Sequence, residues 1–135
     1  MVLFIQKISH KLWRLGIPVL PRVLYALNRV LFAAAIPPSV QIGTNVLLGY
    51  SGLGIVIHAN AVIGNNVKIS QNVTIGGRSG FVNVPVLEDG VQIGAGACIL
   101  GPIRICKNAL VGANAVVLCD VPEGKTVVGV PARII

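Results

Sequence analysis

The sequence predicts an all-β solenoid, a parallel β-helix of hexapeptide repeats preceded by a short helical arm. An aliphatic residue recurs at every sixth position over much of the chain from Ile42 onward, and a small or β-branched residue follows four positions after most of them. This period fits neither a helix nor a half-buried strand whose alternation stops at a turn. Kept over about eighty residues, it indicates one short strand and one corner per repeat. The aliphatic positions are Ile57, Ile63, Ile69, Ile75, Leu87, Ile93, Ile99, Ile105, Val111 and Val117.

Residues 1–38 are expected to form a basic, amphipathic arm of two helices, over residues 2–16 and 21–34. In the first helix, apolar residues recur at helical spacing with basic residues between them. Pro21 stands in the first turn of the second helix, where its missing N–H costs little, and Pro37-Pro38 ends that helix. Three roles stay open for the arm: packing on the end of the solenoid, contact between subunits, or contact with a membrane surface.

The β-helix is expected over residues 39–135, with two interruptions. Nine residues instead of six separate Leu48 from Ile57, so the extra residues must be accommodated at a corner. The pattern also fades over residues 76–86, which are expected to form a loop outside the coil, and loops of this kind often carry function in solenoids. Residues 121–135 lose the period and are expected to close the open strand edges.

The composition is that of one apolar domain with a basic end. Only 11% of the residues are charged, and the net charge is +7. Residues 1–36 hold five basic residues and no acidic residue. We expect no nucleic-acid partner, because this segment is mostly aliphatic and offers no stacking platform. Charges and prolines interrupt the stretches long enough to span a bilayer. We therefore expect a cytoplasmic protein, with contact between residues 1–36 and the inner membrane face left open.

The three cysteines give no sign of a disulfide framework or a metal site. Cys98, Cys106 and Cys119 form no CxxC motif and cannot all pair, so reduced thiols are the simplest account. A zinc site needs several His, Cys or Asp residues close together, and no such cluster occurs in the sequence. We expect no bound metal.

Counting by three repeats, or about 18 residues, predicts a bare corner along the coil. Two adjoining columns of small residues result, in which His58 is the one large side chain. The exposed backbone of such a corner suits a long, thin ligand. The alternative is that tight β-helix corners simply prefer glycine. The two columns are His58, Gly76, Gly94 and Gly112, and Ala59, Gly77, Ala95 and Ala113.

His58 is the leading candidate for catalysis. It is one of two histidines and stands in an outward-facing position where the repeat favours glycine. Imidazole can accept a proton from a hydroxyl group near neutral pH, as a general base must. The alternative is a surface histidine without a role.

Several segments together resemble the serine acetyltransferase family of hexapeptide-repeat acyltransferases, over residues 39–135. The resemblance implies a left-handed β-helix, a homotrimer, and acetyl-CoA bound in the groove between subunits, where Gly77, Ala95 and Ala113 match positions that line the groove. The segments are Gly54-Ile55-Val56-Ile57-His58, Ala61-Val62-Ile63-Gly64, Val73-Thr74-Ile75-Gly76-Gly77, Ile93-Gly94-Ala95-Gly96-Ala97, Ile99-Leu100-Gly101 and Gly129-Val130-Pro131-Ala132-Arg133.

The chain departs from this family at two places. Gly49-Tyr50 stands where serine acetyltransferases have an Asp-His pair, and Val84 precedes Pro85 where they have a second histidine. The short relatives found with polysaccharide biosynthesis look closer. We therefore expect an acetyl-CoA-dependent O-acetyltransferase acting on a hydroxyl of a sugar or glycan intermediate. The alternatives are a serine O-acetyltransferase of cysteine biosynthesis and a non-catalytic β-helix scaffold.

The expected mechanism is direct attack of the acceptor hydroxyl on the thioester, with His58 as general base. Tyr50 is expected to orient His58 or the acceptor, and a backbone N–H at Gly76-Gly77 to stabilise the oxyanion. The other expected contacts are with the coenzyme phosphates, by Arg78, Lys125 and Arg133, and with the acceptor, by Ser79 and Asn83.

Overall fold

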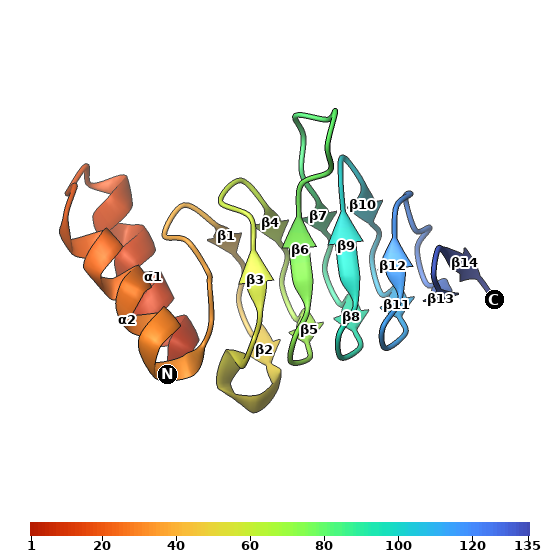
Figure 1. Cartoon of the computed structure of the whole chain (residues 1–135), viewed down its shortest axis with the longest axis horizontal. Coiled ribbons are helices and arrows are strands. Elements are labelled where there is room, and N and C mark those ends of the chain that lie inside the picture. The colour runs from red at the N-terminus through yellow and green to blue at the C-terminus, as the bar shows by residue number, and fades with distance from the viewer.

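The computed structural model describes all 135 residues and is a left-handed β-helix with two helices at its N-terminal end (Figure 1). The predicted fold class is confirmed. The coil has three faces of parallel strands, which we name after the first strand of each. The β1 face contains β1 (Gln41–Ile42), β4 (Val62–Ile63), β7 (Val86–Leu87) and β10 (Arg104–Ile105). The β2 face contains β2 (Leu47–Leu48), β5 (Lys68–Ile69), β8 (Gln92–Ile93), β11 (Leu110–Val111), β13 (Thr126–Gly129) and β14 (Ala132–Ile134). The β3 face contains β3 (Val56–Ile57), β6 (Thr74–Gly76), β9 (Cys98–Leu100) and β12 (Val116–Val117).

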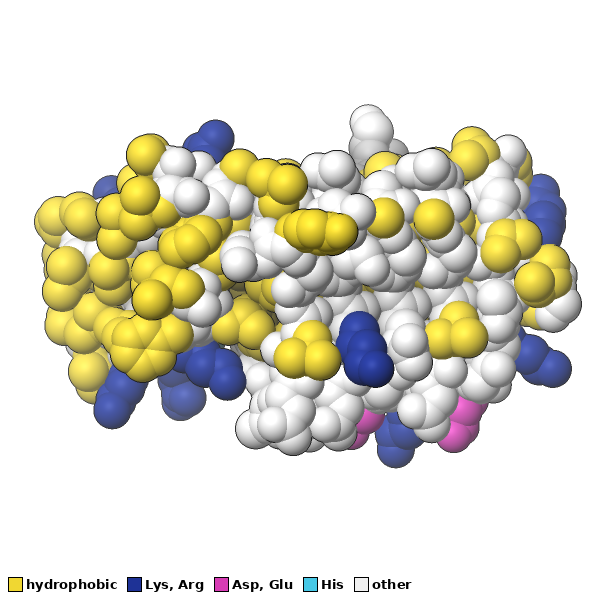
Figure 2. All heavy atoms as spheres, turned by 90° about the horizontal axis from the view of Figure 1, so that it is seen from below, with side chains coloured by type: hydrophobic (Ala, Val, Ile, Leu, Met, Phe, Trp, Pro, Cys, Tyr) yellow, Lys and Arg dark blue, Asp and Glu magenta, His cyan; other side chains and the backbone are white.

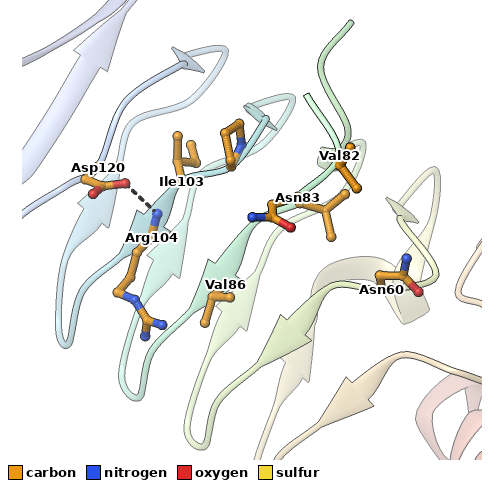
Figure 3. A pocket seen from close by; sticks show the side chains of 9 residues that line it. Asn60, Val82, Asn83, Val86, Ile103, Arg104 and Asp120 are labelled. Atoms are coloured by element: carbon orange, nitrogen blue, oxygen red, sulfur yellow. Dashed lines mark hydrogen bonds between the residues drawn. The ribbon is translucent and has the colours of Figure 1, made fainter. Parts of the chain in front are cut away.

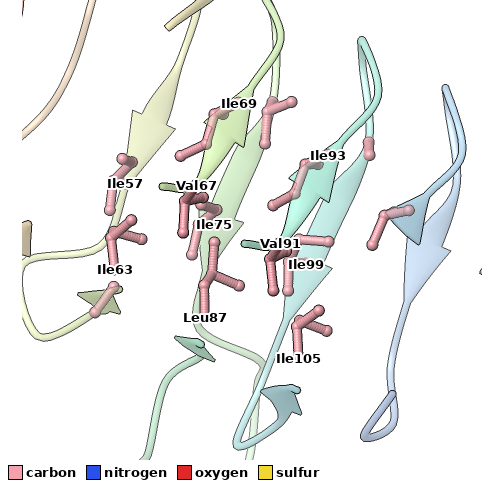
Figure 4. Close-up of a cluster of buried hydrophobic side chains, with 14 of the residues drawn as sticks. Ile57, Ile63, Val67, Ile69, Ile75, Leu87, Val91, Ile93, Ile99 and Ile105 are labelled. Atoms are coloured by element: carbon pink, nitrogen blue, oxygen red, sulfur yellow. The ribbon is translucent and has the colours of Figure 1, made fainter. Parts of the chain in front are cut away.

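The six-residue period arises because each short strand turns one aliphatic side chain inward. These side chains stack on their counterparts one coil away, as Ile57 stacks on Ile75 and Ile75 on Ile99. Figure 4 shows the resulting columns of isoleucine, leucine and valine. The core cluster has 27 buried residues and runs the length of the coil. Because each coil is covered mainly by its neighbours, stability comes from the interfaces between coils.

The corners hold a second sequence signal, which is asparagine in the left-handed backbone region. Five asparagines, Asn45, Asn66, Asn72, Asn108 and Asn114, have positive φ angles between 56° and 60°. Asparagine tolerates this conformation better than most residues because its short amide side chain bonds locally. Gly54 takes the same left-handed role, directly above Asn72 in the stack. Many corners therefore turn on one Asn or Gly, whereas the corner after β3, which carries His58, has no residue with a positive φ angle.

The two interruptions of the period are where the sequence predicted them. The extra residues before β3 form a short 3-10 turn, η1 (Gly49–Gly52), and residues 77–85 leave the coil as a loop between β6 and β7. Figure 1 shows this loop projecting from one edge of the molecule and η1 at the opposite edge. At the C-terminus β14 runs antiparallel to β13 and covers the last strand edge.

The two predicted helices are present as α1 (Val2–Arg14) and α2 (Leu20–Phe32), and each ends two residues earlier than expected. The second helix ends because Ala33 adopts a left-handed conformation, with φ 53°. The helices pack against each other and reach the coil through Val2 and Phe32. Neither has the length and apolar content that crossing a membrane requires.

Candidate functional site

We call the corner where the chain passes from the β3 face to the β1 face the loop edge, since it carries residues 77–85. His58 lies on this edge, directly after β3, and is half-buried. Its backbone N–H donates to Ile75 O at 2.7 Å, which fixes its position on the coil. Its Nδ1 accepts a hydrogen bond from the backbone N–H of Asn60 at 3.1 Å. In a neutral ring this bond places the proton on Nε2.

Gly76 and Gly77 lie beside His58 one coil further along. A Cβ on Gly77 would come no nearer than 3.9 Å to His58 Cδ2 and 4.0 Å to Val84 Cγ1, which is ordinary contact. The nearest atom to a Cβ on Gly76 would be 3.7 Å away. Neither glycine has a positive φ angle, and the Gly77 N–H has no hydrogen-bond acceptor in the chain. Crowding and backbone strain therefore do not explain these two glycines, and they leave open space with a free amide beside His58.

The expected continuous column of small residues is wrong. Gly76 is paired with Leu100 in the register of β6 and β9. The next coil along the loop edge therefore carries a large side chain at this position. Gly94 and Gly112 follow β8 and β11 instead, on the corner between the β2 and β3 faces. The spacing of about 18 residues per coil fails here because residues 77–85 form a loop outside the coil. Residues after the loop therefore lie one corner away from the position that this spacing predicts. We call this second corner the turn edge, since it carries η1.

Steric crowding explains why Gly94 and Gly112 are glycines, whereas it does not explain Gly76 and Gly77. A Cβ on Gly94 would meet Ala113 N at 2.6 Å, and a Cβ on Gly112 would meet Val128 Cγ1 at 2.8 Å. Close stacking of the coils therefore requires glycine at both positions. Ala95 and Ala113 accompany them on the turn edge, where Ala95 O accepts a hydrogen bond from Asn114 N–H at 2.8 Å. Within one chain, the width of the β3 face separates these alanines from Gly77.

The loop holds Arg78 over the neighbouring coil. The Arg78 side chain packs close to Gly101, where its Cβ lies 3.2 Å from the site of an added methyl group, and its guanidinium lies 5.4 Å from the centre of the Phe81 ring. Such a cation–π contact orients a guanidinium without neutralising it. Ser79, one residue further along the loop, is exposed and forms no hydrogen bond.

A cleft of about 470 Å³ lies under the loop on the β1 face (Figure 3). Asn83, predicted to contact the acceptor, lines it from the loop, and Asn60 lines it two residues after His58. The full lining is Asn60, Val82, Asn83, Val84, Val86, Pro102, Ile103, Arg104 and Asp120. Asn60, Arg104 and Asp120 are not predicted from the sequence, because the repeat indicates which positions face outward but not which of them line the same cleft.

Arg104, which lines this cleft, is bonded to two carboxylates, one through its guanidinium and one through its backbone N–H. Arg104 Nη1 lies 2.8 Å from Glu88 Oε2, and the Arg104 backbone N–H donates to Asp120 Oδ1 at 2.8 Å. The hydrogen bond from Arg104, together with one from the Lys107 backbone N–H, holds the pKa of Glu88 below its ordinary value. Burial and the Glu88 charge raise the pKa of the nearby Cys106 thiol, so this cysteine is a poor nucleophile.

Tyr50 lies on the turn edge and not beside His58, because β3 runs between them. Its side chain is 77% exposed and borders an apolar hollow of about 450 Å³ against the end of α2. Tyr50 and Ser51 both have left-handed backbone angles, with φ 48° and 55°. Strain of this kind costs roughly 1–3 kcal/mol per residue and collects at functional sites. The chain therefore presents Tyr50 at a strained corner, but a single subunit does not place it next to His58.

The remaining predicted residues lie in the last coil, far along the chain from the loop. Lys125 is exposed just before β13, and Arg133 lies on β14 with Nη1 donating to Ala132 O at 3.2 Å. One chain therefore does not gather Arg78, Lys125 and Arg133 into a single phosphate site. No group of three or more His, Cys, Asp or Glu side chains comes together anywhere in the structure.

Comparison with known proteins identifies the repeat and its relatives. The family models for the six-repeat bacterial transferase hexapeptide and for the hexapeptide repeat of succinyl-transferase match residues 85–119 and 39–71. The serine acetyltransferase of Synechococcus elongatus is 39% identical over 132 residues, which are 96% of this chain and 54% of the relative. The serine acetyltransferase of Escherichia coli K12 is 44% identical over 96% of this chain and 48% of its own length.

Solved structures show the same similarity. Soybean serine acetyltransferase in complex with serine superposes with a TM-score of 0.94 at 42% identity, covering 99% of this chain and 56% of that protein. A serine acetyltransferase in complex with CoA gives a TM-score of 0.93 at 41% identity, with coverage of 99% and 55%. The chain thus spans about half the length of the relatives it matches.

These comparisons overturn the expected sugar or glycan acceptor. The relatives are serine acetyltransferases at 39–46% identity over most of the chain, and the expected assignment to polysaccharide biosynthesis finds no support among them. The two missing family histidines, at Tyr50 and Val84, do not outweigh this similarity. The similarity along the rest of the coil favours the alternative that names serine, and it favours an enzyme over a scaffold.

Proposed function

We propose that this chain, a serine acetyltransferase-like hexapeptide-repeat protein, transfers the acetyl group of acetyl-CoA to the hydroxyl of L-serine. The observation that carries the proposal is the similarity just described, which extends over the whole coil and includes structures bound to serine and to CoA. The loop edge supplies the chemistry that such a transfer needs: a histidine, an unpaired backbone N–H and open space between them.

His58 is the proposed general base, since the family positions at Tyr50 and Val84 carry no histidine in this chain. The base takes the proton from the serine hydroxyl as its oxygen attacks the thioester carbonyl carbon. The Asn60 N–H occupies Nδ1 and leaves the proton on Nε2, so the resting ring is a donor at Nε2. Turning the ring about its Cβ–Cγ bond releases Asn60 and presents an unprotonated nitrogen to the hydroxyl. Catalytic hydrogen bonds often form only when substrate binds.

The free N–H of Gly77 is the proposed donor to the oxyanion that forms on the carbonyl oxygen. A fixed amide beside developing negative charge lowers the barrier, because it needs no reorganisation when the charge appears. The C–S bond then breaks, and His58 returns its proton to the departing thiolate. There is room for this beside Gly77, since the nearest atom outside its own chain neighbours, His58 Cδ2, lies 3.9 Å from where a side chain would begin.

Acetyl-CoA supplies the activated acetyl group, and Arg78, Lys125 and Arg133 are the proposed partners of its phosphates. We propose a homotrimer, because one chain separates its coenzyme-binding candidates onto two edges. In a three-fold assembly with parallel coil axes, the loop edge of one subunit can face the turn edge of the next. His58 and Gly77 of one copy would then share a groove with Ala95 and Ala113 of its neighbour. Tyr50 would reach the same groove from the turn edge.

The test is release of CoA thiol from acetyl-CoA by the purified protein with and without L-serine. Acceleration by L-serine, and formation of O-acetylserine detected by mass spectrometry, is the expected result. L-Alanine is the matched control, because it differs from serine only in lacking the hydroxyl. Equal rates with serine, alanine and buffer would refute the proposed acceptor. The native mass in light scattering tests the trimer independently.

A further inference from the structure

We propose that the helical hairpin of α1 and α2 docks on an anionic lipid surface. The surface in question, which we call the hairpin surface, is the exposed apolar face that the two helices turn to solvent. Figure 2 shows hydrophobic side chains crowding this end of the molecule, with Lys and Arg at their margins. The proposal concerns where the protein resides and is independent of the acetyl transfer proposed above.

Each helix carries an exposed apolar stripe at helical spacing. On α1 the stripe includes Phe4, which is 65% exposed, and on α2 it includes Val30, which is 82% exposed. Spacings of three, four, seven and eleven place such residues on one face of a helix. The hairpin surface consists of Phe4, Ile8, Leu15, Leu20, Val23, Leu27, Val30 and Leu31. Soluble monomers seldom leave so many large apolar side chains exposed together, so the surface indicates a partner.

Basic side chains flank both stripes. Lys7, Lys11 and Arg14 follow one another at intervals of four and three along α1, and Arg22 and Arg29 are seven residues apart on α2. All five are exposed, and residues 1–36 contain no acid to neutralise them. An apolar stripe bordered by lysine and arginine is the arrangement of helices that lie in a membrane interface, with the charges directed to lipid phosphates.

The inner face of the hairpin is polar, which is the reverse of an ordinary buried helix pair. Gln6 Nε2 donates to Val40 O at 3.2 Å and to Pro37 O at 3.3 Å, and Asn28 Nδ2 donates to Val2 O at 3.2 Å. Gln6 and Asn28 are at most 2% exposed. The Gln6 bonds attach α1 to the start of the coil, and the Asn28 bond joins α2 to α1. The hairpin therefore cannot rotate to bury its apolar stripes without leaving buried polar groups unpaired.

The positive charge of the helices favours an anionic lipid surface over a second copy of the chain as the partner of the hairpin surface. A second copy docking face to face would bring ten basic residues together, five from each hairpin, with no acidic residue in either arm. Like charges placed together in this way are repulsive. An anionic bilayer surface instead offers apolar depth for the stripes and negative headgroups for the rim, and each Lys or Arg near it adds on the order of 1 kcal/mol. Lipid satisfies both parts of the hairpin surface at once.

The experiment is co-sedimentation of the full chain with vesicles of phosphatidylcholine alone or with about one third phosphatidylglycerol. We expect binding only to the anionic vesicles, weakened by added salt. Lys7→Gln and Arg29→Gln should each weaken binding about five-fold, which corresponds to about 1 kcal/mol per charge. Lys107→Gln, in an exposed corner of the coil, is the matched control and should have no effect. Phe4→Ser and Val30→Ser should also reduce binding, whereas Val130→Ser, an exposed valine at the other end of the chain, should not.

Two results would overturn the proposal. One is the absence of binding to anionic vesicles at low salt, or equal binding to neutral and anionic vesicles. The other is a native mass that falls on Phe4→Ser or Val30→Ser while the parent protein ignores vesicles, since this assigns the hairpin surface to a second copy of the chain. Circular dichroism of each variant confirms that the fold is retained.

Discussion

His58 and Asn60 are joined by a hydrogen bond within the same corner, from the Asn60 backbone N–H to His58 Nδ1 over 3.1 Å. The bond fixes both the orientation of the imidazole and the nitrogen that carries its proton. In a neutral ring His58 therefore carries its proton on Nε2, and in the proposed mechanism proton acceptance requires the ring to turn. This relationship separates two chemical roles for the same side chain, one as base and one as donor.

The first prediction distinguishes these roles by substitution. His58→Ala should lower acetyl transfer by about 10²–10⁴-fold, the usual contribution of a positioned general base, while CoA binding persists. His58→Gln keeps a hydrogen-bond donor of similar reach but cannot accept the proton. Equal loss in the two variants supports a base, whereas substantial activity in His58→Gln would assign His58 the role of donor. Steady-state rates and calorimetric CoA binding provide the two measurements.

The second prediction concerns the two classes of glycine. Gly94→Ala should destabilise the fold by about 1–3 kcal/mol, because its Cβ would meet the Ala113 backbone nitrogen at 2.6 Å. Gly77→Ala has room for its methyl group and should leave the denaturation midpoint nearly unchanged while reducing acetyl transfer. Urea denaturation and rate measurements on both variants test this. A strongly destabilised Gly77→Ala protein would show that Gly77 serves packing after all.

The third prediction concerns coenzyme binding by Arg78. Its guanidinium is exposed on the loop and forms no ion pair, so it is free to meet a phosphate. Arg78→Ala should raise KM for acetyl-CoA about ten-fold with a smaller change in kcat, since a hydrogen bond to a charged group contributes roughly 1.5–3 kcal/mol. Arg22→Ala removes the same charge from the helical arm and serves as control. An unchanged KM would remove Arg78 from the coenzyme site.

The fourth prediction is a pH dependence of stability that Glu88 causes. Hydrogen bonds from Arg104 and the Lys107 backbone lower the pKa of Glu88 in the folded state. A lowered carboxyl pKa stabilises the fold above the ordinary pKa, and the stabilisation disappears as the pH falls through the lowered value. Glu88→Gln should therefore melt below the parent protein at neutral pH, and the two should converge in acid. The effect should be small because the pair is partly exposed.

Glu123→Gln is the control for this experiment, because Glu123 is an exposed carboxylate without a hydrogen bond or ion pair. Its melting temperature should follow the parent protein across the pH range. A difference between Glu88→Gln and the parent that persisted at the acid end would mean that the carboxylate charge is not the cause.

The fifth prediction tests how the arm is attached to the coil. Gln6→Leu removes two hydrogen bonds, to the carbonyls of Pro37 and Val40, and should cost about 1–3 kcal/mol because the buried Val40 carbonyl is left without a partner. The Pro37 carbonyl keeps its hydrogen bond from the Val40 N–H at 3.3 Å. Amide hydrogen exchange should rise in the arm and the first coil but not in the last coils. Gln92→Leu, at an exposed strand position, is the control. Equal exchange in the parent and Gln6→Leu would contradict the proposed attachment.

Much of the fold could be predicted because the β-helix repeats locally. Ile57 and Ile75 occupy equivalent positions one coil apart, and both sequence spacing and backbone geometry require this. The two interruptions were also visible, since a departure from a strict period is easily located. His58 is a catalytic candidate because a histidine stands where the repeat favours glycine, and its role stays a prediction. The acceptor was predicted wrongly because two missing residues outweighed similarity spread over the whole coil.

The class of fold, the arm, the loop and the outward position of His58 follow from periodicity or from its local failure, so they can be predicted from the sequence alone. Which of these features lie close together is known only from the tertiary structure. It moved Gly94 and Gly112 to a different edge from Gly76, because the projecting loop shifts the register by one side. It also separated Tyr50 from His58 and placed Asn60 against the imidazole. The repeat determines whether each side chain points inward or outward. Which residues become neighbours on adjacent coils depends on the total number of residues in the loops and turns between them.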